Sequence, residues 1–295
     1  MPTPLRIAVL GPGGVGGLLA AVLARDGHDV VVLARPSTVD HLRDHGLRLQ
    51  SASLGDADVR VAAAARLDDP VDVVLVTVKA TQLEESLASV PPAVVGQAVV
   101  VPFLNGLDHV ERLKQVYPTG QVATGTIRVE AERVAPGVVV HRSPFALVEL
   151  APDTADPAVV QQLTDALTRA GLSVTVRHDA RQALWDKLAV LAPLALFTTR
   201  AAAPWGVVRD TAWGDVESMV REISTVAAAE GVEVDPASVL AFLTGVPDGM
   251  RSSMQKDAEA GNPVELDAIG GSLLRAATAA GVPMPVTARV VAALG

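Results

Sequence analysis

Residues 5–16 read LRIAVLGPGGVG, a short apolar stretch that runs directly into a glycine-rich loop. An alanine- and leucine-rich helix is expected over residues 14–26, and a second, valine-rich strand over residues 29–34. The loop fits the pattern G-x-G-x-x-G, which is a weak signal by itself. Here strand, loop, helix and strand follow one another within about thirty residues, as in a βαβ unit that binds a dinucleotide.

The three glycines of the pattern have separate expected tasks. Gly11 allows the tight turn, Gly13 lets the backbone approach a pyrophosphate, and Gly16 lets the helix approach the strand. Gly14 and Val15 open the helix, whose first N–H groups and positive dipole end suit phosphate. The loop is therefore predicted to bind the cofactor, and a glycine-rich turn without a ligand is the alternative.

The rest of the first half continues this alternation. Residues 71–78 form a strand candidate that is apolar on consecutive positions, and residues 98–103 form another. Consecutive apolar residues indicate a strand covered on both faces, so a parallel sheet with helices on both sides is favoured. After Val122 the pattern changes to short strands joined by turns, with a hairpin or two expected, at residues 122–129, 137–141, 146–150 and 172–176.

The second half reads as helix. Helical periodicity and capping residues mark stretches near residues 180–197, 208–230, 236–244 and 264–280. We therefore predict an α/β fold in two parts, with the boundary near residue 178. Residues 1–178 form an N-terminal Rossmann-type, doubly wound domain for the dinucleotide, and residues 179–295 form a C-terminal all-α domain for substrate binding and dimerisation.

Composition narrows the classes of function. The chain has 295 residues, 33 acidic and 24 basic side chains, a formal charge of −9 and no cysteine. The acid excess argues against nucleic acid or an anionic membrane as the main partner. Without cysteine there is no disulfide framework, thiolate nucleophile or cysteine zinc site. The longest apolar run, residues 188–197, is about half the length of a membrane-spanning helix, and a cytoplasmic protein is expected.

The residues after the second strand help to choose the dinucleotide. NAD sites usually place Asp or Glu there to bind the ribose hydroxyls. This chain has Ala34, Arg35, Pro36 and Ser37 instead, so no carboxylate is present. Arg35 can pair with a 2′-phosphate, which favours NADP(H) over NAD(H). A solvated loop arginine is the alternative reading.

Polar residues follow two further strands at their carboxyl ends, where open parallel sheets bind ligands. Lys79 follows the third expected strand, and Gln82 lies three residues further on. Asn105 and Gly106 follow the fourth. Lys79, Gln82 and Asn105 are expected to face the cofactor. A strand-end lysine in solvent and an ordinary Asn-Gly turn are the alternatives.

Lys187 stands out in the helical half. It lies three residues after Leu184 and four before Leu191, so it shares the apolar face of its helix. A lysine in that position either extends its ammonium to solvent or faces a ligand. Partial desolvation lowers the pKa of an ammonium, so such a lysine is a usable general acid. Reduction of a ketone by hydride produces an alkoxide, which needs a proton donor of this kind.

Two other patterns in the sequence can be explained by secondary structure alone, without a role in catalysis or metal binding. Asn262, Pro263 and Glu265 resemble a capping box at a helix start, which would make Glu265 a structural residue. His41 and His45 have metal-compatible spacing on a helix, but the glutamate of H-E-x-x-H is missing. A solvated helix face is therefore preferred for the histidines, and no metal is expected.

Taken in order, these motifs resemble the ketopantoate reductase family, whose members reduce 2-dehydropantoate with NADPH on the route to pantothenate and coenzyme A. The resemblance covers nearly the whole chain. It rests on the glycine loop, Arg35, residues 78–82 (VKATQ), Asn105-Gly106, residues 185–188 (WDKL), Glu222, residues 252–254 (SSM) and Glu265. The ordered set is far more specific than any single member.

The resemblance implies a role for each matched residue. Lys187 would protonate the carbonyl oxygen, and Glu265 would hydrogen-bond the substrate and help to place Lys187. Ser253 would bind the substrate carboxylate, whereas Asn105 and Lys79 would position cofactor and substrate. Glu265 would then serve catalysis as well as the helix start.

One departure from the family concerns the substrate site. Family members carry asparagines four and eight residues after the lysine, where they contact substrate, and this chain has Leu191 and Ala195 there. A buried hydroxyl left without a partner costs roughly 1–3 kcal/mol, so a hydroxylated acid should bind less well. The expected activity is NADPH-dependent reduction of a small-molecule 2-oxo acid, with 2-dehydropantoate the leading candidate. A less polar carbonyl substrate is the alternative.

Two questions stay open at this point. A dinucleotide-sensing regulator without turnover is a third reading, and Lys187 and Glu265 argue against it because a sensor needs no proton donor. Alanine- and valine-rich stretches at residues 226–229 and 276–280 would be covered in a homodimer through the helical domain. Internal packing would cover the same stretches equally well.

Overall fold

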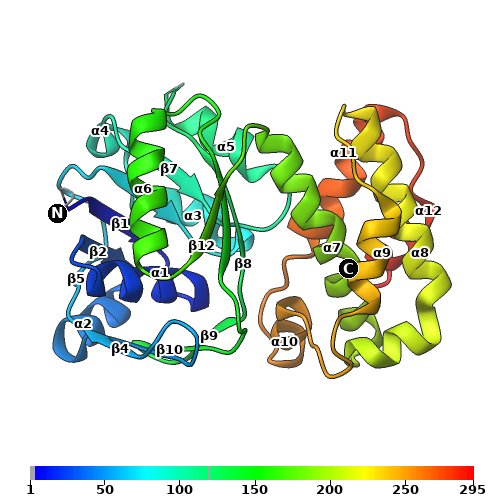
Figure 1. Ribbon diagram of the computed structural model, residues 1–295, viewed down its shortest axis with the longest axis horizontal. Helices are drawn as coiled ribbons and strands as arrows, with labels where there is room; N and C mark the ends of the chain where they lie inside the picture. The colour runs from blue at the N-terminus through cyan, green and yellow to red at the C-terminus, as the bar shows by residue number, and fades with distance from the viewer. Residues whose placement is uncertain (1–3, 119) are drawn as a thin grey trace. The chain divides into compact units, whose positions relative to one another are not determined.

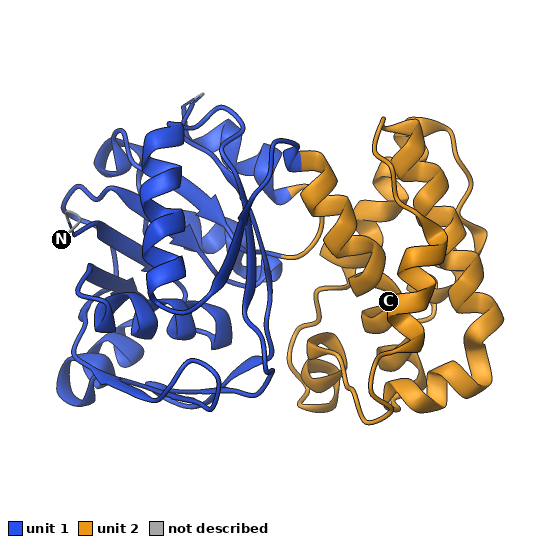
Figure 2. Cartoon of the chain, in the orientation of Figure 1, with its two compact units in different colours: residues 1–104, 109–180 blue, residues 105–108, 181–295 orange. Residues whose placement is uncertain are grey.

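The computed structural model describes residues 4–118 and 120–295. The chain divides into two compact units (Figure 2). The first contains residues 1–104 and 109–180, and the second contains residues 105–108 and 181–295. The short segment 105–108 therefore belongs to the helical unit although it lies within the sequence of the first.

A five-stranded parallel sheet forms the centre of the first unit, in the order β5-β2-β1-β6-β7 (Figure 1). Its strands are β1 (Arg6–Leu10), β2 (Asp29–Leu33), β5 (Ala62–Ala64), β6 (Val73–Val76) and β7 (Val99–Pro102). Every residue of β6 and β7 is buried, as predicted for strands covered on both faces. Because all neighbouring strands are parallel, their carboxyl ends meet at one edge.

Two smaller sheets complete the first unit. One has the order β4-β3-β10-β9 and the other the order β12-β11-β8. Their strands are β3 (Leu47–Ser51), β4 (Ala57–Val59), β8 (Thr124–Arg128), β9 (Ala131–Ala135), β10 (Val138–His141), β11 (Leu147–Ala151) and β12 (Ser173–Val176). A hairpin occurs in this region between β9 and β10, which are antiparallel and adjacent in the chain, but its first strand is not one of the predicted strands.

Helices pack on these sheets. They are α1 (Gly14–Arg25), α2 (Pro36–His45), α3 (Leu83–Leu87), α4 (Pro92–Val95), α5 (His109–Val116) and α6 (Pro157–Arg169), with a 3-10 turn η1 (Ala80–Gln82). Helix α1 contacts the parallel sheet and also the sheet of β3, β4, β9 and β10. Residues 16–23 of α1 are all buried, as expected of a helix that is apolar on every side.

The sequence does not predict β3, β4, β5 or β9. Strand β5 consists of three alanines, a residue with a low preference for strands. Strand β9 is almost entirely exposed, so it lacks the alternation of apolar and polar residues that marks a half-buried strand. Pairing with neighbouring strands, rather than local sequence, places these segments.

The regular elements of the second unit are all helical. They are α7 (Ala180–Ala201), α8 (Trp205–Ala229), α9 (Pro236–Thr244), α10 (Ser253–Glu259), α11 (Ser272–Ala280) and α12 (Pro285–Ala292), with a π-helical turn η2 (Asp267–Gly271). The predicted fold class, a parallel α/β part followed by an all-α part, is thus confirmed. Helices α10 and α12 and the π-helical turn were not predicted.

A second hydrophobic core lies among these helices, with Trp185 and Trp205 its largest fully buried side chains. Val226, Ala227 and Ala277 belong to it, so internal packing covers part of the two apolar stretches noted in the sequence. No single helix in the described ranges is long and apolar enough to cross a membrane. Helices α7 and α8 meet that length and composition only as a pair bent by 108°.

Candidate active site

Each glycine of the loop has a different environment. Gly11 has φ +92°, a left-handed conformation that favours glycine. A Cβ on Gly16 would lie 2.2 Å from the Gly11 carbonyl oxygen, so helix and strand approach closely only because residue 16 is glycine. By contrast, a Cβ on Gly13 would meet no atom within 4 Å. Open space therefore lies beside Gly13, where the motif brings a pyrophosphate against the backbone.

The amino end of α1 suits an anion. Gly13 is its N-cap and offers no side-chain hydrogen bond, and the first turn contains no acidic residue. The first N–H groups of a helix, here those of Gly14, Val15 and Gly16, have no partner within the helix. Their dipoles add partial positive charge at this end. The residues present therefore fit the pyrophosphate of a dinucleotide.

Two contacts that the sequence does not predict shape this loop. The Thr77 hydroxyl, directly after β6, lies 2.9 Å from the carbonyl oxygens of Leu10 and Gly11 and donates to them. A Cβ on Gly14 would lie 2.0 Å from the carbonyl oxygen of Ala131 in β9. Thr77 therefore holds the turn in place, and residue 14 must be glycine because β9 packs against it.

Two arginines follow neighbouring strands at the carboxyl edge of the parallel sheet. Arg35 is the extended residue before α2, and its side chain is exposed. Strands β2 and β5 pair with Leu33 opposite Ala64, and the Ala34 N–H donates to the Ala64 carbonyl at 3.0 Å. Arg66 lies two residues beyond the end of β5, in a bend, and its side chain is also exposed. Sequence reasoning missed Arg66 because β5 itself was not predicted.

Lys79 and Gln82 lie beyond β6 at the same edge. Lys79 is half-buried and precedes η1, whereas Gln82 ends η1 and is exposed. The Gln82 N–H donates to the Lys79 carbonyl at 2.9 Å, so the two residues close one tight turn. Since β6 pairs with β1, with Leu10 opposite Val76, this turn follows the strand beside the glycine loop.

In the second unit, the fold brings Asn105 and Glu265 together although 160 positions separate them in sequence. Asn105 Nδ2 donates to Glu265 Oε2 at 2.9 Å. Glu265 is only 9% exposed, and a carboxylate buried to that extent needs hydrogen-bond partners. The amide and the carboxylate therefore orient each other, which no local spacing could have predicted.

The capping-box prediction for Glu265 is wrong. Asn262, Pro263 and Glu265 are all non-helical, and the helix begins one residue after Glu265. The Glu265 carbonyl accepts from the Ile269 N–H at 3.0 Å, which makes Glu265 the flanking residue and not the third residue of the helix. Its carboxylate accepts from Asn105 instead, a partner from a distant part of the sequence.

Helix α7 carries Lys187, Leu191 and Ala195 at intervals of four residues, so they lie along one stripe of the helix. Lys187 and Leu191 are half-buried, and Ala195 is fully buried in the second core. The helix begins at Ala180, directly after Asp179. The two residues that follow Lys187 on this stripe are apolar, and of these Leu191 is partly accessible whereas Ala195 is not.

The two neighbouring serines differ. Ser252 Oγ accepts from the Gln255 N–H at 3.1 Å and lies 2.7 Å from the Thr198 hydroxyl of α7, so Ser252 caps α10 and joins it to α7. Ser253, the first residue of α10, is exposed. Ser253 is therefore the serine that is accessible to a ligand.

Glu222 has a structural position. Its carboxylate accepts from the N–H groups of Val286 and Thr287, at 2.8 and 3.0 Å, and from the Thr287 hydroxyl at 2.7 Å. These residues open α12 just after Pro285, so Glu222 of α8 satisfies N–H groups that the helix leaves unpaired.

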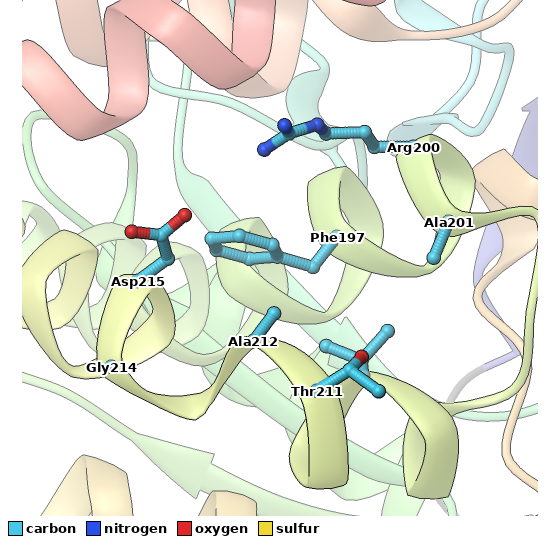
Figure 3. A pocket seen from close by; sticks show the side chains of 8 residues that line it. Phe197, Arg200, Ala201, Thr211, Ala212, Gly214 and Asp215 are labelled. Carbon is cyan, nitrogen blue, oxygen red and sulfur yellow. The ribbon is translucent and has the colours of Figure 1, made fainter.

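A cavity of about 550 Å³ lies elsewhere in the second unit, at the kink of α8 (Figure 3). Phe197, Arg200 and Asp215 point into it, and the kinked residue Ala212 lines its wall. Asp215 is paired with Arg289 at 2.8 Å. None of the candidate site residues lines this cavity, so we assign it no part in the chemistry. Among the residues that the structure describes, no group of three histidine, aspartate or glutamate side chains could hold a metal ion.

Two family models match the chain. Residues 7–151 match the model described as ketopantoate reductase PanE/ApbA, and residues 179–295 match the model of its C-terminal part. A 2-dehydropantoate 2-reductase of Mycobacterium tuberculosis (strain ATCC 25618 / H37Rv) is 30% identical, over 95% of this chain and 94% of its own length.

Solved structures give the same picture of the fold. The 2-dehydropantoate 2-reductase from Methylococcus capsulatus has a TM-score of 0.87 at 28% identity, covering 98% of this chain and 96% of its own. D-mandelate dehydrogenase, solved with NADH and anilino(oxo)acetate, has a TM-score of 0.90 at 23% identity, covering 98% of this chain and 97% of its own. At that identity the second likeness concerns the fold alone.

Proposed function

Because this chain belongs to the ketopantoate reductase family of oxidoreductases, we propose that it catalyses the NADPH-dependent reduction of a 2-oxo acid. The leading substrate is 2-dehydropantoate, the compound in the name of the Mycobacterium tuberculosis relative. The dinucleotide, when bound, supplies the hydride for the carbonyl carbon. The residues of the chain bind the dinucleotide, orient the acid and deliver the proton.

The main support for the proposal is the open space beside Gly13, at the amino end of α1, which has no side-chain cap. Two other glycines of the loop are required by packing, at Gly14 and Gly16, whereas Gly13 is not. A glycine that packing does not require is explained by a ligand that must approach the backbone. The pyrophosphate is therefore assigned to this position, bound by the first N–H groups of α1.

Charge at the sheet edge supports NADPH over NADH. No carboxylate follows β2 to accept the ribose hydroxyls, and exposed Arg35 takes that place. Arg66, exposed two residues after the neighbouring strand β5, adds a second guanidinium for a 2′-phosphate. Lys79 and Gln82, in the turn after β6, are assigned to the cofactor on the same edge.

We assign protonation of the carbonyl oxygen and binding of the 2-oxo acid to residues of the second unit. Lys187 is the general acid that protonates the carbonyl oxygen as hydride reaches the carbon. The Asn105–Glu265 pair, at 2.9 Å, offers an oriented amide and carboxylate to the substrate oxygens. Ser253, exposed at the start of α10, is assigned to the substrate carboxylate.

One observation favours a second candidate substrate. Leu191, one turn beyond Lys187, is half-buried and apolar, and fully buried Ala195 follows it on the same stripe. Neither side chain can hydrogen-bond a hydroxylated acid. A 2-oxo acid with an apolar side chain would instead bury that group against Leu191.

The experiment that tests the proposal follows NADPH consumption by absorbance with 2-dehydropantoate and 2-oxo acids of graded polarity, with NADH in parallel. Rapid turnover of 2-dehydropantoate with NADPH would support the leading candidate, and a better apolar substrate would support the second. Binding of NADPH without turnover of any acid would contradict both.

A single variant separates the two substrates. Leu191→Asn restores an amide at an accessible position, whereas asparagine at buried Ala195 would overpack the core. A large gain on 2-dehydropantoate at unchanged NADPH affinity would mean that the wild-type site suits a less polar acid. No gain would mean that the site binds 2-dehydropantoate through other groups.

A further inference from the structure

We propose that Arg275 is a positioning residue, which ties together the two chain segments that carry Asn105 and Glu265. The inference rests on the proposed function, because it takes these two side chains to act on the substrate. Arg275 lies on α11, ten residues after Glu265, and no motif of the sequence points to it.

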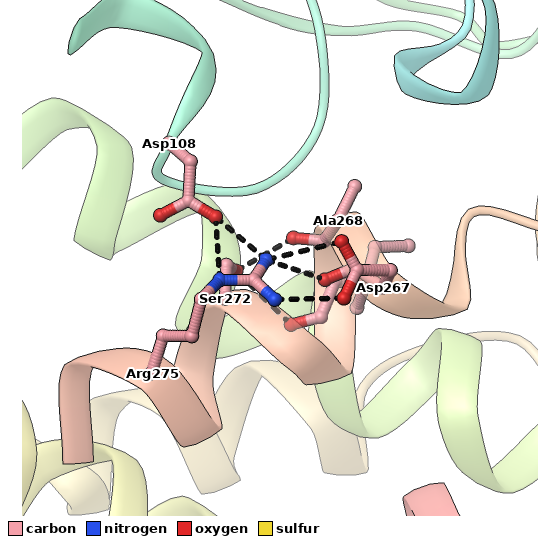
Figure 4. Close-up of polar contacts among 6 residues, drawn as sticks. Asp108, Asp267, Ala268, Ser272 and Arg275 are labelled. Carbon is pink, nitrogen blue, oxygen red and sulfur yellow. Dashed lines mark hydrogen bonds and ion pairs between the residues drawn. The ribbon is translucent and has the colours of Figure 1, made fainter. Parts of the chain in front are cut away.

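The first attachment is to the segment 105–108. Asp108 lies three residues after Asn105, and Arg275 donates to its Oδ2 from Nε at 3.0 Å and from Nη2 at 2.7 Å (Figure 4). Both donors converge on one carboxylate oxygen and are charge-assisted, which makes this a strong contact. The end of the segment that begins with Asn105 is thereby held to α11.

The second attachment is to the π-helical turn η2. Asp267 begins this turn two residues after Glu265, and Arg275 Nη1 donates to its Oδ1 at 2.7 Å. Nη2 lies 3.2 Å from both the Oδ2 and the carbonyl oxygen of Asp267 (Figure 4). One guanidinium therefore binds a residue close to Asn105 and a residue close to Glu265 at the same time.

Backbone packing between the two segments leaves little freedom. Gly106 has φ +92°, and a Cβ there would lie 2.1 Å from the carbonyl oxygen of Ala268. The Ser272 hydroxyl donates to the same Ala268 carbonyl at 2.6 Å (Figure 4). Asn105 and Glu265 therefore lie beside the close contact between Gly106 and Ala268, and Arg275 holds the same two segments together through Asp108 and Asp267.

Arginine suits this task better than lysine. A planar guanidinium presents five N–H donors in a fixed fork, whereas an ammonium is a point charge on a flexible stem. The hydrogen bond to Asp267 is the main influence that raises the pKa of Arg275, so the group stays charged. Its side chain is 50% exposed, and exposed ion pairs add little stability. The expected effect is therefore on geometry and turnover.

The test compares Arg275→Gln, Arg275→Lys and Asp108→Asn with a matched control, Arg289→Gln. Arg289 forms a 2.8 Å ion pair with Asp215 in the same unit and is similarly exposed, at 54%. Small misplacements at a reacting centre can cost up to about 100-fold, so we expect kcat to fall roughly tenfold in Arg275→Gln. The KM for NADPH and the melting temperature should stay close to wild type, and Arg275→Lys should recover part of the loss.

Hydrogen exchange provides a readout that does not depend on turnover. Amides of residues 105–108 and 265–271 should exchange faster in Arg275→Gln and Asp108→Asn than in Arg289→Gln. Unchanged exchange, or an unchanged kcat in both variants, would overturn the positioning role. An equal fall of kcat in Arg289→Gln would mean that loss of charge causes the effect, and it would also overturn the positioning role.

The proposed function and the positioning role fail in different ways. A wild-type protein that reduces no 2-oxo acid would contradict the proposed function, whatever the variants do. A wild-type protein that turns over normally, beside variants with faster exchange but normal kcat, would contradict only the role of Arg275.

Discussion

The glycine loop and the Asn105–Glu265 pair are built in opposite ways. The loop is six consecutive residues between one strand and one helix, and Thr77 and β9 support it from elsewhere in the first unit. The pair joins residues 160 positions apart, and a third residue, Arg275, connects the segments around it. The motif of the proposed cofactor site is thus continuous in sequence, whereas the pair proposed to act on the substrate is assembled from distant segments.

Glycine shows the same difference on a smaller scale. Gly13 has open space beside it, so its missing side chain leaves room for a ligand. Gly106 lies against the Ala268 carbonyl, so its missing side chain leaves room for another part of the chain. Gly13 is therefore proposed to serve binding, whereas Gly106, like Gly14 and Gly16 of the loop, allows close packing.

Substitution of Lys187 should have the largest effect, and it should affect turnover without affecting binding of the cofactor at the glycine loop. Lys187→Ala removes the proposed proton donor, and general acid catalysis typically contributes about 10²–10⁴-fold, so kcat should fall by that factor. Binding of NADPH, measured by fluorescence titration, should not change because the glycine loop is intact. Lys114→Ala, which removes a lysine paired with Asp153 in the first unit, is the control. Normal turnover in Lys187→Ala would refute the assignment.

Two alanine variants within the loop should differ from each other. In Gly16→Ala the new Cβ meets the Gly11 carbonyl, so we expect the free energy of unfolding to fall by about 3 kcal/mol or more. Gly13→Ala should fold normally, since its Cβ meets nothing, yet bind NADPH at least about tenfold more weakly if the pyrophosphate lies there. Thermal unfolding and NADPH titration measure the two effects. Equal NADPH affinity in Gly13→Ala and wild type would place the cofactor elsewhere.

The two arginines at the sheet edge test the choice of cofactor. Arg35→Ala and Arg66→Ala should each weaken binding of 2′,5′-ADP by roughly 5–50-fold, because each removes a charged partner of the 2′-phosphate. Binding of 5′-AMP should change little in calorimetric titrations. Arg6→Ala, at the opposite end of β1, removes the same charge from the same sheet and is the control. Similar losses for both nucleotides would mean that the arginines do not read the 2′-phosphate.

The smallest expected effect concerns pH and His28, in the first unit but away from the glycine loop. Burial lowers the pKa of His28 below its ordinary value of 6.5, and Arg169 lowers it further while Asp26 opposes both. Its Nδ1 accepts from the Leu5 N–H at 3.0 Å, a bond that protonation there would break. The unfolded chain therefore takes up the proton more readily, so the stabilisation is complete above about pH 6.5 and is lost as the pH falls below it.

The corresponding measurement is the melting temperature of wild type and His28→Gln between about pH 5 and pH 8. Wild type should lose a few degrees more than His28→Gln on acidification. His45→Gln, at an exposed histidine, should follow wild type. Parallel curves for wild type and His28→Gln would show that His28 is not the group responsible.

The extent of prediction from sequence differs between the same two regions. The first βαβ unit was predicted element by element, because apolar runs and glycines act on their immediate neighbours in the chain. Strand β5 was missed, and Arg66 with it, because three alanines take their strand conformation from pairing with β2. The sequence pattern wrongly predicts Glu265 as the third residue of a helix that starts at Asn262, because that pattern is indistinguishable from a capping box.

By itself the sequence determined an α/β part followed by an all-α part and the glycine loop between β1 and α1, and it singled out the candidate residues Lys187 and Asn105. Only the tertiary structure decided that Asn105 binds Glu265, that β5 pairs with β2 and so places Arg66 after the strand next to that of Arg35, and that Arg275 joins two distant segments. The physical reason is the range of the interactions. Turn and helix preferences act over a few residues, whereas buried hydrogen bonds and ion pairs form only after packing has brought distant segments together.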